Sequence, residues 1–174
     1  MNKNSSKYPI DEPSEIIRYV QNGYHAFVGC DRASERESFV EAIQVALDGE
    51  IQTFIPCGVV EDRREFVTQI VVACQGFVLA LGQPMLERTP SLASSLEETM
   101  ALYRKQDRQG FLILGDMDRV IEMQRTMEIE GSLRSVMQIY DNRAVVIIAS
   151  NDTINDLVGD YNRPFYMSFR VFRL

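Results

Sequence analysis

Five short runs of apolar and β-branched residues recur along the chain and predict five β-strands. They lie at residues 24–30, 51–60, 110–116, 144–150 and 165–172, and the second run ends near Cys57. The runs GFLILGD at 110–116 and AVVIIAS at 144–150 are apolar along nearly their whole length. Continuous apolar strands of this kind are typical of parallel sheets that are buried on both faces.

Between the strands, apolar residues recur at helical spacing and predict the helices that cover the sheet. The predicted helical segments are residues 14–23, 34–49, 61–81, 91–106 and 132–140. Ser14 is a candidate N-cap for the first of these, and Gly23 and Gly49 are candidate stop signals for the first two. Alternating strands and helices predict a three-layer α/β/α fold around a mainly parallel five-stranded sheet. The polar residues 1–13, with prolines at 9 and 13, predict a flexible N-terminal arm before a single domain at 14–174.

Composition limits the function classes that are open to this domain. The chain has 174 residues, of which 45% are hydrophobic, which suits one domain with a substantial core. Its net charge of -7 argues against direct binding of nucleic acid, because phosphate neutralisation requires clustered Lys and Arg. Three separated cysteines without a CxxC pair suggest neither a disulfide framework nor a zinc site. The absence of a long apolar run predicts a cytoplasmic protein with no membrane partner.

The segment VGCDRASERESFVEAI at residues 28–43 has the layout of a phosphate-binding loop: an apolar strand, a glycine, a polar turn and a helix. A phosphate loop reads GxxxxGK[ST], in which the lysine neutralises phosphate and the hydroxyl holds magnesium. Counted from Gly29, the second glycine is replaced by Ser34, the lysine by Glu35 and the hydroxyl residue by Arg36. Two unit charges of the same sign about 4 Å apart repel by roughly 4 kcal/mol at an effective dielectric constant of 20. A glutamate at this point therefore predicts that nucleotide binding is lost or weak.

A local interpretation accounts for the altered residues of this turn. Ser34 and Glu37 form the pattern S-x-x-E just before an apolar run, which is the pattern of a capping box. This pattern predicts that side chains of the helix itself occupy the anion site at its N-terminus.

The segment FLILGDMDRV at residues 111–120 resembles the Walker B region of ATPase domains of the AAA and STAND kind, where an apolar strand leads into an acidic pair. In this alignment Gly115 stands where the family carries its magnesium-binding aspartate, and Asp116 stands for the catalytic glutamate. Asp118 and Arg119 match the residues that follow. The acidic pair is thus half present.

Two later segments carry the same resemblance. VVIIASND is similar to the sensor strand of these ATPases, with Asn151 at the position that contacts the γ-phosphate. DYNRPFYMSFRV is similar to the segment before their fifth strand and puts Arg163 near the position of their arginine finger. The resemblance covers about residues 15–174 and implies strand order 5-1-4-3-2, without the small helical lid of the family.

For active members the resemblance implies ATP hydrolysis with magnesium. The departures at Glu35, Arg36 and Gly115 predict that neither ATP nor magnesium is a working cofactor, because phosphoryl transfer depends on positioning and charge compensation. The predicted function is an inactive regulatory or protein-interaction module, with an active ATPase or a second copy of the chain as partner. In that interpretation Arg163 is supplied to a neighbouring ATPase or withheld from it. The alternative for Arg163 is a structural role, in which it pairs with Asp160 or caps a helix. A nucleotide-binding, weakly hydrolysing ATPase is the alternative.

A second family competes for the same residues. LILGDMDRV is also similar to the first motif of haloacid dehalogenase-like phosphatases, with Asp116 as nucleophile and Asp118 as acid/base. That family requires a later lysine, and no lysine follows Lys105. His25 is the single histidine and precedes a strand, so a structural role is predicted for it and no Ser/His/Asp constellation is available.

Overall fold

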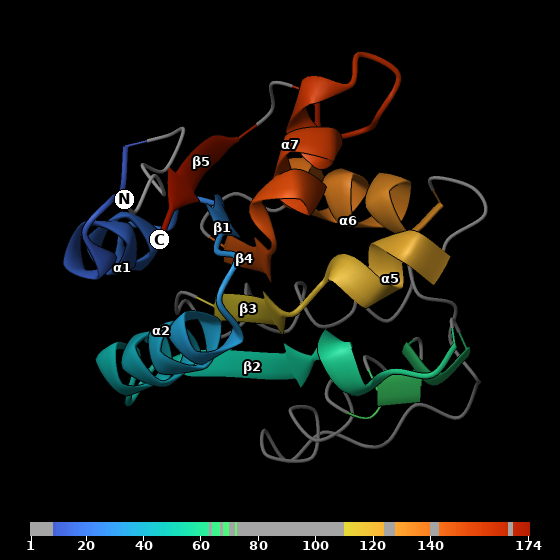
Figure 1. The fold of residues 1–174 in the computed structure, drawn as a ribbon. Helices are drawn as coiled ribbons and strands as arrows, with labels where there is room; N and C mark the ends of the chain where they lie inside the picture. Colours follow the sequence, from blue (N-terminus) through green and yellow to red (C-terminus); the bar gives the residue numbers. More distant parts are fainter. Residues whose placement is uncertain are drawn as a thin grey trace.

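The computed structural model describes residues 9–62, 64–66, 68–69, 72, 110–123, 128–139, 143–166 and 169–174, and they form one parallel sheet flanked by helices (Figure 1). The strands are β1 (Ala26–Gly29), β2 (Ile51–Pro56), β3 (Gly110–Gly115), β4 (Arg143–Ala149) and β5 (Arg170–Arg173). Their order is β2-β3-β4-β1-β5, and every pairing is parallel. The predicted α/β class and strand order are confirmed, since 5-1-4-3-2 is the same order read from the other edge.

Helices lie on both faces of this sheet. They are α1 (Pro13–Gln21), α2 (Ala33–Ala46), the 3-10 turn η1 (Cys57–Val59), α5 (Asp118–Met123), α6 (Glu128–Ile139) and α7 (Asn151–Gly159). Helices α1 and α2 cover one face, and α5, α6 and α7 cover the other (Figure 1). No helix in the part of the chain that the structure describes is long and apolar enough to cross a membrane.

The central strands are apolar on both sides because each side faces its own core. In β4, Val146 and Ile148 pack into the cluster under α1 and α2. Their neighbours Val145 and Ile147 pack into the cluster under α6 and α7. All four side chains are buried. This two-sided burial is the physical reason for the uninterrupted apolar runs in the sequence.

Several element boundaries differ from the predicted ones. Helix α1 begins at Pro13 after Glu12, which makes no side-chain capping bond, so Ser14 is not its N-cap. Two helices that the sequence analysis did not predict, α5 and α7, follow β3 and β4 directly. The last strand is shorter than expected, because Phe165 enters the core from a turn and only Arg170–Arg173 pairs with β1.

The end of the predicted N-terminal arm is attached to the sheet. The amide of Asp11 donates to the carbonyl of Arg173 at 2.7 Å, and the Arg173 amide donates to Asp11 Oδ2 at 2.8 Å. These two bonds engage both backbone groups of Arg173 on the side of β5 that faces away from β1. Asp11 thus covers this point of the edge strand, where an open strand edge would invite pairing with another chain.

Two of the predicted helices fall largely outside the described residues. Of the predicted helix 61–81, residues 64–66, 68–69 and 72 are helical in the structure. The remainder of that segment and the predicted helix 91–106 lie outside the part of the chain that the structure describes.

Candidate functional site

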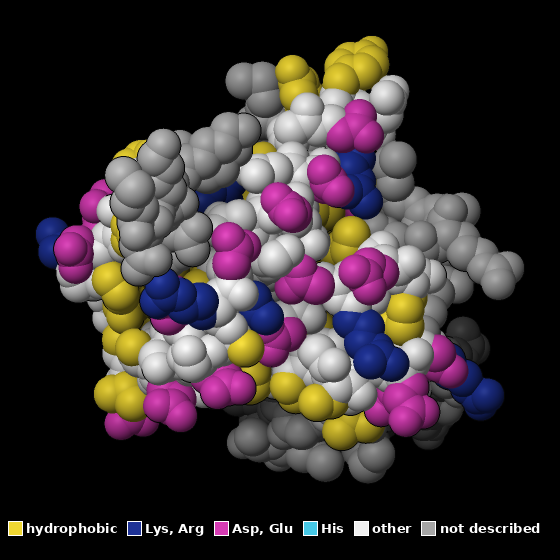
Figure 2. All heavy atoms as spheres, viewed as in Figure 1, with side chains coloured by type: hydrophobic (Ala, Val, Ile, Leu, Met, Phe, Trp, Pro, Cys, Tyr) yellow, Lys and Arg dark blue, Asp and Glu magenta, His cyan; other side chains and the backbone are white. Residues whose placement is uncertain are grey.

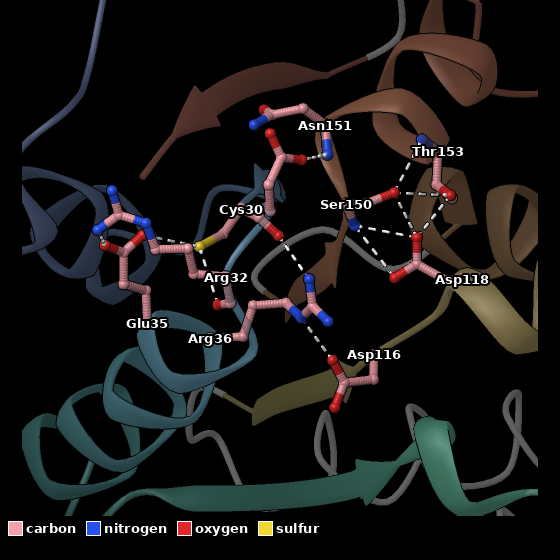
Figure 3. Close-up of polar contacts among 10 residues, drawn as sticks. Cys30, Arg32, Glu35, Arg36, Asp116, Asp118, Ser150, Asn151 and Thr153 are labelled. Carbon is pink, nitrogen blue, oxygen red and sulfur yellow. Dashed lines mark hydrogen bonds and ion pairs between the residues drawn. The ribbon is translucent and has the colours of Figure 1, made fainter. Parts of the chain in front are cut away.

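The carboxyl ends of β1, β3 and β4 meet at one edge of the sheet, and polar side chains follow each of them (Figure 3). In a parallel α/β sheet this edge is where ligands bind. Asp31 lies in the turn after β1 and Arg36 in the first turn of α2, Asp116 lies in the turn after β3 and Asp118 begins α5, and Asn151 follows β4. The structure therefore brings together the residues that the sequence analysis selected at three separate strand ends.

Arg36 crosses this edge from the first turns of α2. Its Nε donates to Asp116 Oδ1 at 2.6 Å, and its Nη1 donates to the carbonyl of Cys30 at 2.6 Å (Figure 3). The Arg36 side chain is only 16% exposed. One guanidinium thus links the turn after β1 to the turn after β3, across the position where a phosphate loop holds its ligand.

The predicted capping box is wrong. Helix α2 starts at Ala33, and its N-cap residue Arg32 is extended and makes no side-chain capping bond. Ser34 is consequently the second residue of the helix and is not in the cap position, so its hydroxyl cannot bond the amide that a capping box requires. Arg36, from the first turn of α2, pairs with Asp116 and the Cys30 carbonyl in place of the expected serine–glutamate box.

Glu35 points away from Arg36 and leaves the centre of the site. Its Oε1 accepts a bond from Arg32 Nη1 at 2.6 Å on the surface of the helix (Figure 3). Its Oε2 lies 3.5 Å from the buried thiol of Cys30. Burial, followed by the hydrogen bond and charge of Glu35, raises the pKa of that thiol, although its bond to the Arg32 carbonyl acts in the opposite direction. Cys30 is therefore a packed thiol and not a reactive one.

Asp31 and Asn151 form a second link across the edge. The Asn151 amide donates to Asp31 Oδ1 at 2.9 Å, and hydrogen bonds from the side chain and backbone of Asn151 hold the pKa of Asp31 below its usual range. The space beside Gly29 is also filled. A Cβ on Gly29 would collide with Asn151 Oδ1 and would lie 2.5 Å from Arg173 Nη1. A side chain at position 29 would therefore have to displace the ends of these two side chains.

Asp118 fastens the turn after β3 to the start of α7. Both of its carboxylate oxygens accept the Ser150 amide at 3.0 Å, and Oδ1 also accepts the hydroxyls of Ser150 at 2.5 Å and Thr153 at 2.6 Å. Burial by itself raises the pKa of Asp118, but the hydrogen bonds from Ser150 and Thr153 outweigh it, so the net shift is downward. A carboxylate held ionised in this way accepts hydrogen bonds and is poorly suited to deliver a proton.

Solved structures of ATPases share this arrangement of strands. The chain is similar to the Walker-type ATPase PABY2304 of Pyrococcus abyssi, with a TM-score of 0.67 and 17% identity over 94% of this chain and 53% of that one. ORC2 of Aeropyrum pernix, in its ADPNP-ADP complexes, gives a TM-score of 0.66 and 11% identity over 98% and 50%. A structure of Drosophila ORC bound to DNA gives 0.59 and 13% over 93% and 85%. This chain has a P-loop NTPase fold.

These similarities concern the fold. No protein-family model and no curated protein matches the sequence. The chain spans about half the length of the first two ATPase structures. The predicted resemblance to this class is confirmed at the level of the P-loop NTPase fold.

Strand β3 ends at Gly115, the residue that the sequence resemblance places at the first Walker B carboxylate. A Cβ on Gly115 would lie 2.9 Å from Cε2 of Phe54, so the ring of the neighbouring strand takes the space that a side chain at 115 would need. Asp116 follows with φ of 53°, a left-handed conformation that aspartate adopts at moderate cost. A Cβ on Gly58 would lie 2.9 Å from the Cβ of Asp116. The glycine at position 58 therefore leaves room for Asp116.

The geometry weighs against the phosphatase alternative. Asp116, the proposed nucleophile, is bound to Arg36, and Asp118, the proposed acid/base, is held by Ser150 and Thr153. Among the residues that the structure describes, no group of three or more His, Cys, Asp or Glu side chains could hold a metal ion. The two aspartates serve as acceptors for the chain's own donors.

Arg163 lies in the turn between α7 and β5, away from the linked strand ends. Its Nη2 forms an ion pair with Glu130 of α6 at 2.9 Å, and the two side chains are 16% and 0% exposed. The sequence analysis considered Asp160 as its partner, but Asp160 contributes only a backbone carbonyl, which accepts the Arg163 amide at 3.0 Å. The guanidinium is engaged inside the chain.

His25 has the structural role that was predicted for it. Its Nδ1 accepts the amide of Val145 at 3.0 Å, which requires the proton on Nε2. Nε2 lies 3.1 Å from the carbonyl of Met137 and donates to it. The neutral ring thus connects the start of β1 to β4 and α6.

Sequence reasoning missed three participants in the site: Phe54, Ser150 and Arg173. Ser150 had a usable signal, because it precedes α7 and its hydroxyl accepts the amide of Thr153 three residues later, as an N-cap does. Phe54 and Arg173 had none, since they reach the site from strands that are distant in sequence.

Proposed function

We propose that this chain is a catalytically inactive ATPase-like domain that acts as a regulatory or protein-interaction module. The observation that carries the proposal is the position of Arg36, whose guanidinium bridges Asp116 and the Cys30 carbonyl across the phosphate-binding edge. In an active ATPase, this space holds phosphates, a lysine and magnesium.

Charge supports the same proposal. Nucleotide entry would require Arg36 to leave Asp116, which would then face the incoming phosphates as an uncompensated carboxylate. At a charge separation of about 4 Å and an effective dielectric constant of 20, each such repulsion is worth roughly 4 kcal/mol. Asp31, on the turn after β1, adds a second carboxylate, which Asn151 already holds. The chain's own donors thus engage both carboxylates, Arg36 by an ion pair with Asp116 and Asn151 by hydrogen bonds to Asp31.

Two further side chains that nucleotide hydrolysis needs are lacking. Glu35 replaces the phosphate-loop lysine and pairs with Arg32, and Gly115 replaces the carboxylate that would hold magnesium. The residues present therefore do not fit a magnesium-nucleotide complex, and the proposal includes no catalytic step.

Docking on a protein, such as an active ATPase or a second copy of the chain, is the proposed role. Donation of Arg163 to a neighbour would break its ion pair with the buried Glu130, and breaking a buried pair destabilises a protein by about 3–5 kcal/mol. The proposed module therefore contributes surface and not a catalytic arginine. Similar structures of Drosophila ORC are bound to DNA, but the net charge of -7 argues against direct contact with nucleic acid in this chain.

Thermal unfolding with and without Mg-ATP or Mg-ADP tests the proposal. A ligand at 100 times its dissociation constant stabilises a protein by about 2.7 kcal/mol, which corresponds to several degrees in Tm for a domain of this size. We expect no shift in Tm and no phosphate release with millimolar nucleotide.

The double variant Glu35→Lys/Arg36→Ser is the matched comparison, because it restores the lysine and the hydroxyl of a phosphate loop. A Tm shift with nucleotide in this variant alone would support exclusion by the native side chains. A saturable Tm shift in the native chain, with or without phosphate release, would contradict the proposal.

A further inference from the structure

An exposed pair of tyrosines stands on the turn between α7 and β5. Tyr161 is 79% exposed and Tyr166 is 39% exposed, and their rings meet edge to face with centroids 6.0 Å apart. In Figure 2, hydrophobic side chains project at the top of the molecule, where Figure 1 places this turn. Aromatic rings exposed to this degree contribute little to the core, and tyrosine is enriched in the binding surfaces of proteins.

The turn that carries these rings is fixed by contacts with α6 and with β1. Arg163 pairs with the fully buried Glu130, and the Arg134 guanidinium donates to the carbonyl of Pro164. Phe165 is fully buried and packs against Phe27 of β1 at a ring distance of 5.1 Å. A turn fixed by three such contacts loses little conformational entropy when a partner binds to it.

The surface beside the tyrosines is negatively charged. Asp152, Asp156 and Asp160 recur every four residues along α7 and its C-terminal end, and all three are exposed. Helix α7 contains no Lys or Arg, and the nearby Arg163 is neutralised by Glu130. Figure 2 shows acidic side chains below the projecting hydrophobic ones, over α7.

Part of this charge opposes the helix. Asp152 lies in the first turn, where a negative charge suits the helix dipole, but like charges four residues apart destabilise a helix and Asp160 lies at its C-terminal end. Asp160 at the C-cap has one local function, because its Oδ1 accepts the amide of Asn162 at 2.9 Å. Asp152 and Asp156 make no ion pair with any residue that the structure describes.

We propose that Tyr161 and Tyr166, together with the acidic face of α7, form a docking surface for a protein segment that presents arginine. A guanidinium stacks on tyrosine rings and forms paired hydrogen bonds with carboxylates, so it complements both components of this surface. An ammonium complements the carboxylates but lacks the planar fork. The inference rests on the proposed function only in naming the chemistry of a protein partner. Asp160 and the tyrosines lie beyond the end of α7 that is away from the linked strand ends, and Asp152 lies next to Asn151 of those ends.

The test uses the full chain, isotope-labelled, and three synthetic peptides of equal length that carry three arginines, three lysines or three citrullines between glycines and serines. Backbone amide shifts are followed during titration without nucleotide. We expect saturable shifts confined to residues 152–166 with the arginine peptide, weaker binding of the lysine peptide and none of the citrulline peptide. Because no nucleotide is used, this result and the nucleotide test succeed or fail independently.

Two exposed substitutions and their matched controls locate the surface. Tyr161→Ser should weaken binding of the arginine peptide about two- to fivefold, the range of an exposed cation–π contact. Asp156→Asn should weaken it about twofold. Tyr24→Ser and Asp48→Asn remove an exposed tyrosine and an exposed aspartate elsewhere and should leave it unchanged. Unperturbed amide spectra away from each substitution verify the fold.

Three results would overturn the proposal. One is the absence of saturable shifts with the arginine peptide. Another is equal binding of the arginine and lysine peptides, with no change in the variant Tyr161→Ser. That result would indicate a diffuse charge effect. The third is concentration-dependent shifts at residues 160–166 without any peptide, since a second copy of the chain would then be the occupant.

Discussion

The ion pair between Arg36 and Asp116 allows a quantitative test of how the site is closed. Arg36→Met removes the guanidinium and keeps most of the aliphatic stem. Asp116→Asn removes the charge and keeps a residue type that tolerates the left-handed conformation at φ of 53°. The two single variants, the double variant and the native chain form a double-mutant cycle that isolates the energy of the pair.

The expected coupling follows from the geometry and the exposure of the two side chains. The atoms Nε and Oδ1 are 2.6 Å apart, and the side chains of Arg36 and Asp116 are 16% and 44% exposed. With charge centres about 4 Å apart, the attraction is about 1 kcal/mol in water and about 4 kcal/mol at an effective dielectric constant of 20. Because Asp116 is well solvated, we expect a coupling of about 1–2 kcal/mol. Arg36→Met also removes the bond to the Cys30 carbonyl and should destabilise the chain by about 2–3 kcal/mol in total.

The free energy of unfolding is measured for all four proteins by urea denaturation followed by circular dichroism. Equal slopes with urea would show that the variants change stability and not the surface exposed on unfolding. A repeat in high salt should reduce the coupling, because the pair is partly open to solvent. A coupling below about 0.5 kcal/mol would place this contact among surface ion pairs of little value and would refute the reasoning that it holds the site closed.

Two further predictions concern the other strand ends. Because the folded chain lowers the pKa of Asp118 below its ordinary value of 3.8, the stabilising effect of this carboxylate is present above that pH and is lost as the pH falls towards the folded value. The stability gap between the native chain and Asp118→Asn, measured by urea denaturation from about pH 6 to pH 2, should therefore narrow on acidification, and a constant gap would contradict the assignment. Gly115→Ala should lower the free energy of unfolding by about 1–3 kcal/mol because its Cβ meets the Phe54 ring, and Phe54→Leu should recover part of this loss when the two are combined. If Gly115→Ala destabilises the native chain and the Phe54→Leu variant equally, the Phe54 ring is not the obstacle.

The fold was accessible from the sequence because its signals are local. Continuous apolar runs at 110–116 and 144–150 indicate strands buried on both faces, and the structure has β3 and β4 there. The resemblance to ATPase domains implied the order of strands and the P-loop NTPase class, and both are confirmed. Shorter elements such as α7 were missed, because three turns of polar residues carry a weak periodic signal.

The candidate site was predictable in its location but not in its contacts. Strand ends meet at one edge in any parallel sheet, so Gly29, Asp116 and Asn151 could be grouped from the sequence. The sequence also shows that the lysine and the first Walker B carboxylate are absent. It suggested a capping box at Ser34, because a pattern of residues does not reveal where a helix starts.

The partners of the site residues depend on three-dimensional packing. Arg36 is 80 residues from Asp116 in the chain. Glu130 of α6 likewise meets Arg163 of the turn between α7 and β5. Which cation meets which carboxylate depends on the direction of each side chain, and that direction follows from helix register and sheet order. The amino-acid sequence thus specifies a P-loop NTPase fold and the residue types that follow its strands, because residue identity is local information. The ion pair between Arg36 and Asp116 is a property of the assembled sheet, because only the folded chain brings those charges within contact distance.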